Sequence, residues 1–69
     1  MGKQIEITTE YITLGQFLKF VGIIRSGALA KEYLASNVIY VNNELEARRG
    51  RKLYKGYKIL INSIEYTLV

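Results

Sequence analysis

Six of the ten positively charged side chains in this 69-residue chain lie within residues 48–58, RRGRKLYKGYK, which we call the basic segment. It contains no carboxylate and carries +6, while the four cations and six glutamates elsewhere sum to −2, which gives the net charge of +4. A patch of this density attracts polyanions and releases counterions from the phosphates that it binds. The basic segment therefore indicates a contact with nucleic acid.

The residues around Gly50 are suited to gripping phosphates: Arg48, Arg49, Arg51 and Lys52. Glycine lets a loop bend closely along a phosphate backbone, and an arginine fork binds two phosphate oxygens at once, which a lysine ammonium does not. Tyr54 adds a ring on which an unpaired base can stack, worth about 1 to 3 kcal/mol. The alternative is a solvated loop whose charges only keep a small protein soluble.

A second group of residues, RSGALAK at 25–31, is also suited to an anion. Ser26 and Gly27 are expected to open a helix, and the first N–H groups of a helix have no partner inside it and can bind a phosphate. Arg25 stands just before this point, and Lys31 lies on the second turn. The alternative is an ordinary serine cap followed by small residues that let two helices approach each other.

The remaining side chains offer little chemistry. Glu44 and Glu46 would share a face of a strand, and we expect them to form a solvated edge with weak surface ion pairs to the arginines. Histidine, cysteine, aspartate and tryptophan are absent, so acid–base catalysis would depend on Glu, Lys or Tyr, and no thiolate metal site can form. We therefore expect no enzyme, no catalytic residue, no metal and no cofactor.

Length and composition predict one ordered domain over residues 1–69, since hydrophobic residues make up 49% of the chain and proline is absent. The N-terminal residues alternate polar with apolar and do not form the continuous apolar run of a signal peptide or a membrane span. We therefore expect a soluble, cytoplasmic protein with no membrane contact.

Two short helices are expected after a first strand at residues 4–8. Thr13 and Gln16 have the spacing of a capping box, which predicts a helix from Leu14, and Gly22 is suited to the left-handed residue that ends it. A second helix is expected from Ser26 to about Ser36, with Asn37 in the left-handed conformation at its end.

The second half of the chain alternates apolar with polar residues, as strands do. Strands are expected at residues 38–41, 44–46, 57–62 and 64–69, with two-residue turns at Asn42-Asn43 and Asn62-Ser63. The basic segment would lie between strands, with Leu53 and Tyr57 turned toward the core. The predicted fold is α+β, with two short N-terminal helices packed on a small, mostly antiparallel sheet in the order β-α-α-β-β-β-β.

Residues 12–61 resemble the αL-motif RNA-binding domain of ribosomal small-subunit protein S-four, a domain also found on bacterial tyrosyl-tRNA synthetases and pseudouridine synthases. The matching residues are the helix pair Leu14 and Leu18, the group Arg25, Ser26, Ala30 and Lys31, and the hairpin residues Ile39, Val41 and Asn42. The stand-alone bacterial branch of the YaaA and YbcJ type is the most similar, through Ser26, Gly27, Ala30, Lys31, Arg51, Lys52 and Leu53. The chain departs from the family pattern at Thr13, Gly15 and Tyr57.

The resemblance implies RNA binding without catalysis. Combined with the residue patterns above, it gives the expected RNA-binding residues: Arg25, Ser26, Gly27, Lys31, Arg48, Arg49, Arg51, Lys52 and Tyr54. The expected partner is structured RNA, ribosomal RNA or transfer RNA, in ribosome assembly or translation, together with a ribosome-associated protein. We expect a monomer.

One rival interpretation is a protein-interaction module whose basic face docks an acidic partner on a ribosome-associated factor. Binding to duplex DNA is disfavoured, because no helix carries the dense row of basic and amide side chains that reads the major groove. Replacing Arg48, Arg49 and Arg51 by alanine is expected to weaken the binding of every RNA while the fold stays intact.

Overall fold

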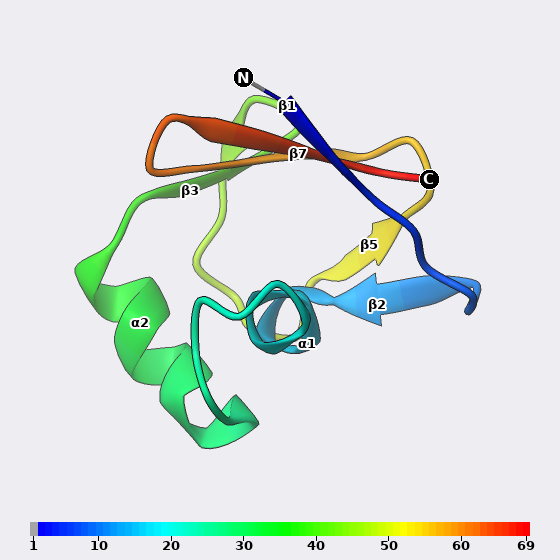
Figure 1. The fold of residues 1–69 in the computed structure, drawn as a ribbon. Coiled ribbons are helices and arrows are strands. Elements are labelled where there is room, and N and C mark those ends of the chain that lie inside the picture. The colour runs from blue at the N-terminus through cyan, green and yellow to red at the C-terminus, as the bar shows by residue number, and fades with distance from the viewer. Residues whose placement is uncertain (1) are drawn as a thin grey trace.

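The chain forms two layers, a five-stranded sheet and a second layer of helices with a small two-stranded ribbon (Figure 1). The computed structural model describes residues 2–69. Its elements are β1 (Gly2–Ile5), β2 (Tyr11–Thr13), α1 (Leu14–Phe20), the 3-10 turn η1 (Gly27–Leu29), α2 (Ala30–Ser36), β3 (Ile39–Val41), β4 (Glu44–Leu45), β5 (Lys52–Tyr54), β6 (Lys58–Ile61) and β7 (Ile64–Leu68). The predicted α+β class, with two helices and a mostly antiparallel sheet, is confirmed.

The large sheet has the strand order β1-β7-β6-β3-β4, and only the β1–β7 pair is parallel. The first strand begins at Gly2, earlier than predicted, and it pairs with the last strand of the chain. Just beyond this ladder, the N–H of Ile7 donates to the carbonyl of Val69 at 3.0 Å, and the N–H of Val69 donates to that of Ile5 at 2.9 Å. The first and last strands are thus held side by side (Figure 1).

Both predicted hairpin turns are present in the sheet. Asn42 and Asn43 have φ angles of 51° and 69°, and Asn62 and Ser63 have φ angles of 51° and 66°. Two successive left-handed residues match the right-handed twist of the strands that they join, as in a type I′ turn. These turns set the register of β3 with β4 and of β6 with β7, which places Ile39, Val41, Ile59 and Ile61 on the buried face.

Helix α1 begins and ends where the sequence predicts. The Thr13 Oγ1 accepts from the N–H of Gln16 at 3.3 Å, and the Gln16 Oε1 accepts from the N–H of Thr13 at 3.0 Å, a complete capping box. Gly22 has a φ of +83° and donates its N–H to the carbonyl of Lys19, while the N–H of Ile23 donates to that of Leu18. This pair of bonds is a Schellman motif, which satisfies two of the free carbonyls at the end of the helix.

The second helix ends at Ser36, as predicted, but it begins at Ala30, and the conformation of Asn37 beyond its end differs from the prediction. It is preceded by the η1 turn, at which Ser26 occupies the cap position without a side-chain hydrogen bond to the turn. Asn37 is not left-handed but extended, with a φ of −134°, because the chain runs directly into β3; its Nδ2 donates to the carbonyl of Tyr33 at 2.9 Å instead. Neither α-helix within residues 2–69 is long and apolar enough to cross a membrane.

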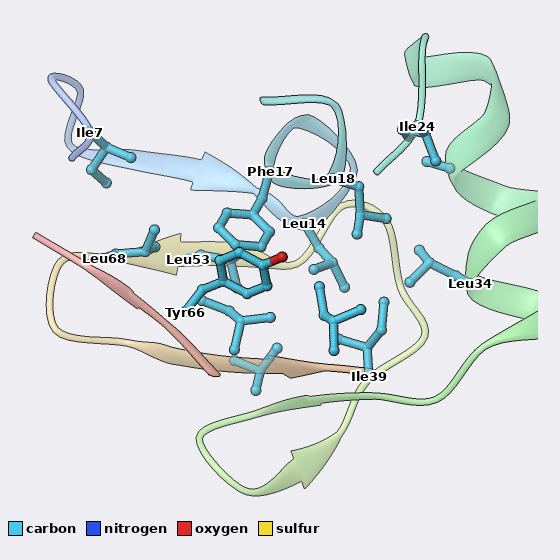
Figure 2. Packing of buried hydrophobic residues seen from close by; sticks show 14 residues of the cluster. Ile7, Leu14, Phe17, Leu18, Ile24, Leu34, Ile39, Leu53, Tyr66 and Leu68 are labelled. Atoms are coloured by element: carbon cyan, nitrogen blue, oxygen red, sulfur yellow. The ribbon is translucent and has the colours of Figure 1, made fainter. Parts of the chain in front are cut away.

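The core lies between the two layers (Figure 2). Leu14, Phe17 and Leu18 of α1 are fully buried against the inner face of the sheet, and Phe17 meets Tyr66 of β7 edge to face at 5.4 Å. Leu34 of α2 is buried in the same cluster. Helix α1 is therefore the central element of the second layer.

A small antiparallel ribbon of β2 and β5 was not predicted. It pairs Tyr11 with Tyr54, Ile12 with Leu53 and Thr13 with Lys52. Part of the basic segment is therefore a strand, rather than only a connection between strands. Leu53 is fully buried, as expected, and Tyr57 is half-buried against the core.

Candidate nucleic-acid interface

The basic segment is fixed to the beginning of α1 through its backbone. The N–H groups of Leu14 and Gly15 donate to the carbonyls of Arg51 and Arg49, each at 2.8 Å. These are the first amides of the helix, which have no partner inside it. The segment therefore caps the helix, and its own position relative to α1 is set by these bonds.

Gly15 explains how the basic segment can lie so close to the helix. A Cβ atom at this position would lie 3.4 Å from the carbonyl oxygen of Arg49 and 3.4 Å from the Cβ of Ala30. A side chain longer than alanine would push these neighbours away. Gly15, one of the three departures from the family pattern, therefore lies at a tight junction between α1, α2 and the basic segment.

Glu46 is the centre of a buried polar cluster, and the prediction that it lies on a solvated edge is wrong. It is 6% exposed. Its carboxylate accepts from Arg48 Nε at 3.0 Å and Nη2 at 3.1 Å, from Arg51 Nη1 at 2.8 Å, and from the N–H groups of Ala47 and Arg48 at 3.1 and 3.0 Å. Five donors satisfy the buried charge, whereas Glu44 is exposed, as expected.

The same cluster divides the arginines of the basic segment into two kinds. Arg51 is 24% exposed, is paired with Glu46 and lies over the ring of Tyr57 at 6.0 Å, so it is largely a structural cation. Arg48 keeps 76% of its side chain exposed, although one edge of its guanidinium is bound to Glu46. Arg49 and Lys52 are exposed, and within residues 2–69 neither forms a salt bridge.

The Glu46 cluster predicts a loss of stability in acid. Hydrogen bonds from the Arg48 side chain, followed by those from the Arg48 backbone and Arg51, lower the pKa of Glu46 from 4.5 to about 2, against the opposing effect of burial. The lowered pKa means that the stabilisation is complete above pH 4.5 and is lost as the pH falls toward 2. The full lowering of the pKa corresponds to a contribution of at most about 3 kcal/mol to the free energy of unfolding. Because solvent around the arginines screens the charges, the expected contribution is about 1 to 2 kcal/mol.

Urea unfolding at pH 6, 4, 3 and 2 measures this loss, with Glu46→Gln as the variant that cannot titrate at this position. The difference in unfolding free energy between the parent and Glu46→Gln is expected to shrink across this range. A difference that stays constant down to pH 2 would contradict the role of the ionised carboxylate.

The basic segment and residues 25–31, which we call the helical group, meet in a shallow hollow beside the beginning of α1. It is lined by Thr13, Gly15, Gln16, Gly27, Ala30, Arg49 and Gly50. Gly27 comes from the helical group and Arg49 from the basic segment, so the fold brings these two predicted residues together. A Cβ at Gly27 or Gly50 would meet nothing within 4 Å, so there is open space at both of these glycines, which line the hollow together with Arg49.

Ala30 also lines this hollow, whereas the charged and polar residues of the helical group, Arg25, Ser26 and Lys31, lie outside it. Arg25 lines a different hollow together with Leu29, Glu32 and Tyr33. Lys31 and Ser26 are exposed at the beginning of α2 and at the cap of η1, and neither lines the hollow that contains Arg49. The two cations of the helical group, Arg25 and Lys31, therefore do not line the hollow that contains Arg49.

Three tyrosines form a cluster at the ribbon of β2 and β5. The ring centroids of Tyr11 and Tyr54 are 5.9 Å apart, and those of Tyr54 and Tyr57 are 5.7 Å apart. The Lys52 ammonium lies over the Tyr11 ring, 4.9 Å from its centroid. The sequence predicts a stacking role for Tyr54 but gives no such signal for Tyr11, which only alternates with Ile12 and Thr13.

Comparison with known proteins gives two matches. The chain matches the family described as S4 domain over residues 5–69. It is 54% identical over 56 residues to the probable ribosome maturation protein RlbA of Bacillus subtilis (strain 168), and the alignment covers 81% of this chain and 79% of that protein. No solved structure gives a significant match. Both matches agree with the resemblance drawn from residues 12–61.

Proposed function

Since the chain belongs to the S4 domain family, we propose that it is a non-catalytic RNA-binding protein that acts in the cytoplasm during ribosome maturation. The similarity to the probable ribosome maturation protein of Bacillus subtilis supports the process. The RNA would be structured ribosomal RNA or a transfer-RNA-like element, bound through its shape and its phosphates.

The position of Arg49 is the observation that carries this proposal. Its backbone is fixed to α1 through the bond from Gly15, its side chain is exposed, and open space adjoins it at Gly27 and Gly50. A guanidinium held in this way is prepared to bind a phosphate in a bidentate manner, with little further ordering of the backbone.

The other exposed cations extend this surface in two directions. Lys52 continues it along β5, while Arg25, Ser26 and Lys31 flank it on the side of η1 and α2. Arg48 and Arg51 add positive charge, but Glu46 occupies one edge of the Arg48 guanidinium and the Nη1 of Arg51. Such a surface suits the phosphates and 2′-hydroxyls along the shallow minor groove of an RNA helix, because the deep A-form groove is closed to side chains.

A salt titration tests the proposed mode of binding. If four to six phosphates are engaged, the logarithm of the association constant for an RNA hairpin is expected to fall against the logarithm of the salt concentration with a slope of about −3 to −5. Fluorescence anisotropy of a labelled hairpin between about 50 and 300 mM KCl measures the slope. A slope near zero would exclude phosphate contacts as the main source of affinity.

A DNA competitor and a ribonuclease treatment make the test specific. A DNA hairpin of the same sequence is expected to compete poorly, because it lacks the A-form groove and the 2′-hydroxyls. If an acidic protein bound this surface instead, the partner recovered from cells would stay bound after ribonuclease treatment, and that result would contradict the RNA proposal.

A further inference from the structure

We propose that the outer face of the β2–β5 ribbon binds one unpaired nucleotide beside the RNA duplex, with its base stacked on Tyr54 and its phosphate on Lys52. The inference rests on the proposed RNA-binding function and adds a preference for junctions between a duplex and a single strand. It assigns Tyr11 and Tyr57 to the positioning of the Tyr54 ring.

The pairing of the ribbon places these side chains on one face. Ile12 and Leu53 are opposite each other and point to the core, where Leu53 is fully buried. Because side chains alternate along a strand, the pair formed by Tyr11 and Tyr54 points outward, and Lys52 lies on the same face as Tyr54. The apolar packing of the ribbon is thus supplied by its inner face, and packing alone does not require the outer rings.

The ring of Tyr54 is accessible and held in position. It is 37% exposed, yet it lies between Tyr11, whose plane is tilted by 51°, and Tyr57, whose plane is tilted by 62°. Contacts on two sides restrict the rotation of the Tyr54 ring. The Tyr54 side chain therefore loses little conformational entropy when a base stacks on it. Sequence-tolerant stacking on such rings is a common way to bind unpaired bases.

The neighbouring cation is placed for the phosphate of the same nucleotide. Lys52 precedes Tyr54 by two positions on β5, which corresponds to about 7 Å along a strand. Its ammonium is held over the Tyr11 ring and remains exposed, with no salt bridge among residues 2–69. Arg49, Lys52 and Tyr54 follow one another along the protein chain. The phosphates of one RNA strand can therefore contact Arg49 and Lys52, and the next unpaired base can stack on Tyr54.

The test compares two RNA hairpins with the same stem, each closed by a polyethylene glycol linker that carries no bases. One is blunt, and the other has a two-nucleotide single-stranded extension that contains 2-aminopurine. The parent protein is expected to bind the extended hairpin more tightly and to quench the 2-aminopurine fluorescence. Tyr54→Leu is expected to lower affinity for the extended hairpin by about 5- to 100-fold, to abolish the quenching and to leave affinity for the blunt hairpin unchanged. Tyr54→Phe keeps the ring and is expected to behave as the parent.

Tyr40→Leu is the matched control, because Tyr40 is 39% exposed and lies on β3, in the other sheet. It is expected to change neither affinity. Thermal unfolding of every variant verifies that the ribbon is folded.

Three results would overturn the stacking site. They are equal binding of both hairpins by the parent, unchanged discrimination in Tyr54→Leu, and a loss in Tyr54→Leu that is the same for both hairpins. If the blunt hairpin still bound with the expected salt dependence, the proposed function would stand without the stacking site. If the parent bound neither hairpin, both would be overturned.

Discussion

Replacing Glu46 by alanine is expected to lower the free energy of unfolding by about 2 to 4 kcal/mol, because a buried carboxylate with five donors is removed and its donors lose their partner. Arg51, which is only 24% exposed, is left without its counterion. The effect exceeds that of protonating Glu46, since a protonated carboxyl can still accept hydrogen bonds, whereas alanine cannot. For a domain of this length, total stability is of the order of 3 to 10 kcal/mol.

Thermal unfolding measures this effect as a decrease of at least about 10 °C in the melting temperature. Glu44→Ala is the matched control, because it removes the same side chain from an exposed position two residues earlier. It is expected to change the unfolding free energy by less than about 0.5 kcal/mol. Equal melting temperatures for the two variants would show that the Glu46 cluster does not stabilise the fold.

Neutralising the exposed cations around the hollow is expected to weaken RNA binding by about 100-fold or more at roughly 0.1 M salt, because each lost phosphate contact also removes a counterion-release contribution. The test variant replaces four residues by glutamine: Arg25, Lys31, Arg49 and Lys52. None of them forms a salt bridge within residues 2–69, so the fold is expected to be retained. Anisotropy titration with the blunt hairpin measures the loss.

The control for this variant must have the same net charge. It replaces by glutamine four lysines that lie outside the proposed surface: Lys3 and Lys19, together with Lys55 and Lys58 at the end of the basic segment. Both variants lower the formal charge from +4 to 0, and the control is expected to lose less than about 10-fold in affinity. Equal losses would mean that net charge, rather than this surface, determines binding.

The structure also changes the choice of residues for such an experiment. The sequence suggested replacing Arg48, Arg49 and Arg51 together without damage to the fold. In the folded protein, two of these side chains satisfy Glu46, so their removal would leave a buried carboxylate without its ion pairs. A loss of RNA binding in that triple variant would therefore combine unfolding with the loss of contacts.

The features that sequence predicted well depend on neighbouring residues. The capping box of Thr13 and Gln16 and the left-handed Gly22 fix both ends of α1 through contacts within a few positions. The hairpins at Asn42-Asn43 and Asn62-Ser63 are likewise set by residues that tolerate positive φ. With the alternation of the later strands, these signals suffice for the fold class.

The features that were missed depend on the path of the folded chain, which no local pattern of residues shows. The β2–β5 ribbon joins two three-residue strands, too short to show a period of their own. The burial of Glu46 follows from the path of the basic segment toward α1, which brings Arg51 back over the carboxylate. For the site, the sequence identified the charged residues but could not distinguish Arg49, which is free of Glu46, from Arg48 and Arg51, which are bound to it.

The parallel pairing of β1 with β7 has a kinetic consequence. The strands β3, β4, β6 and β7 are connected in part by tight hairpins within residues 38–69, whereas β1 reaches β7 only by closing nearly the whole chain into a loop. Closure of a long loop is entropically costly and contributes late in folding. Contacts that form after the rate-limiting barrier slow unfolding without accelerating folding. We therefore expect the β1–β7 pairing to govern how long the folded protein persists rather than how quickly it forms.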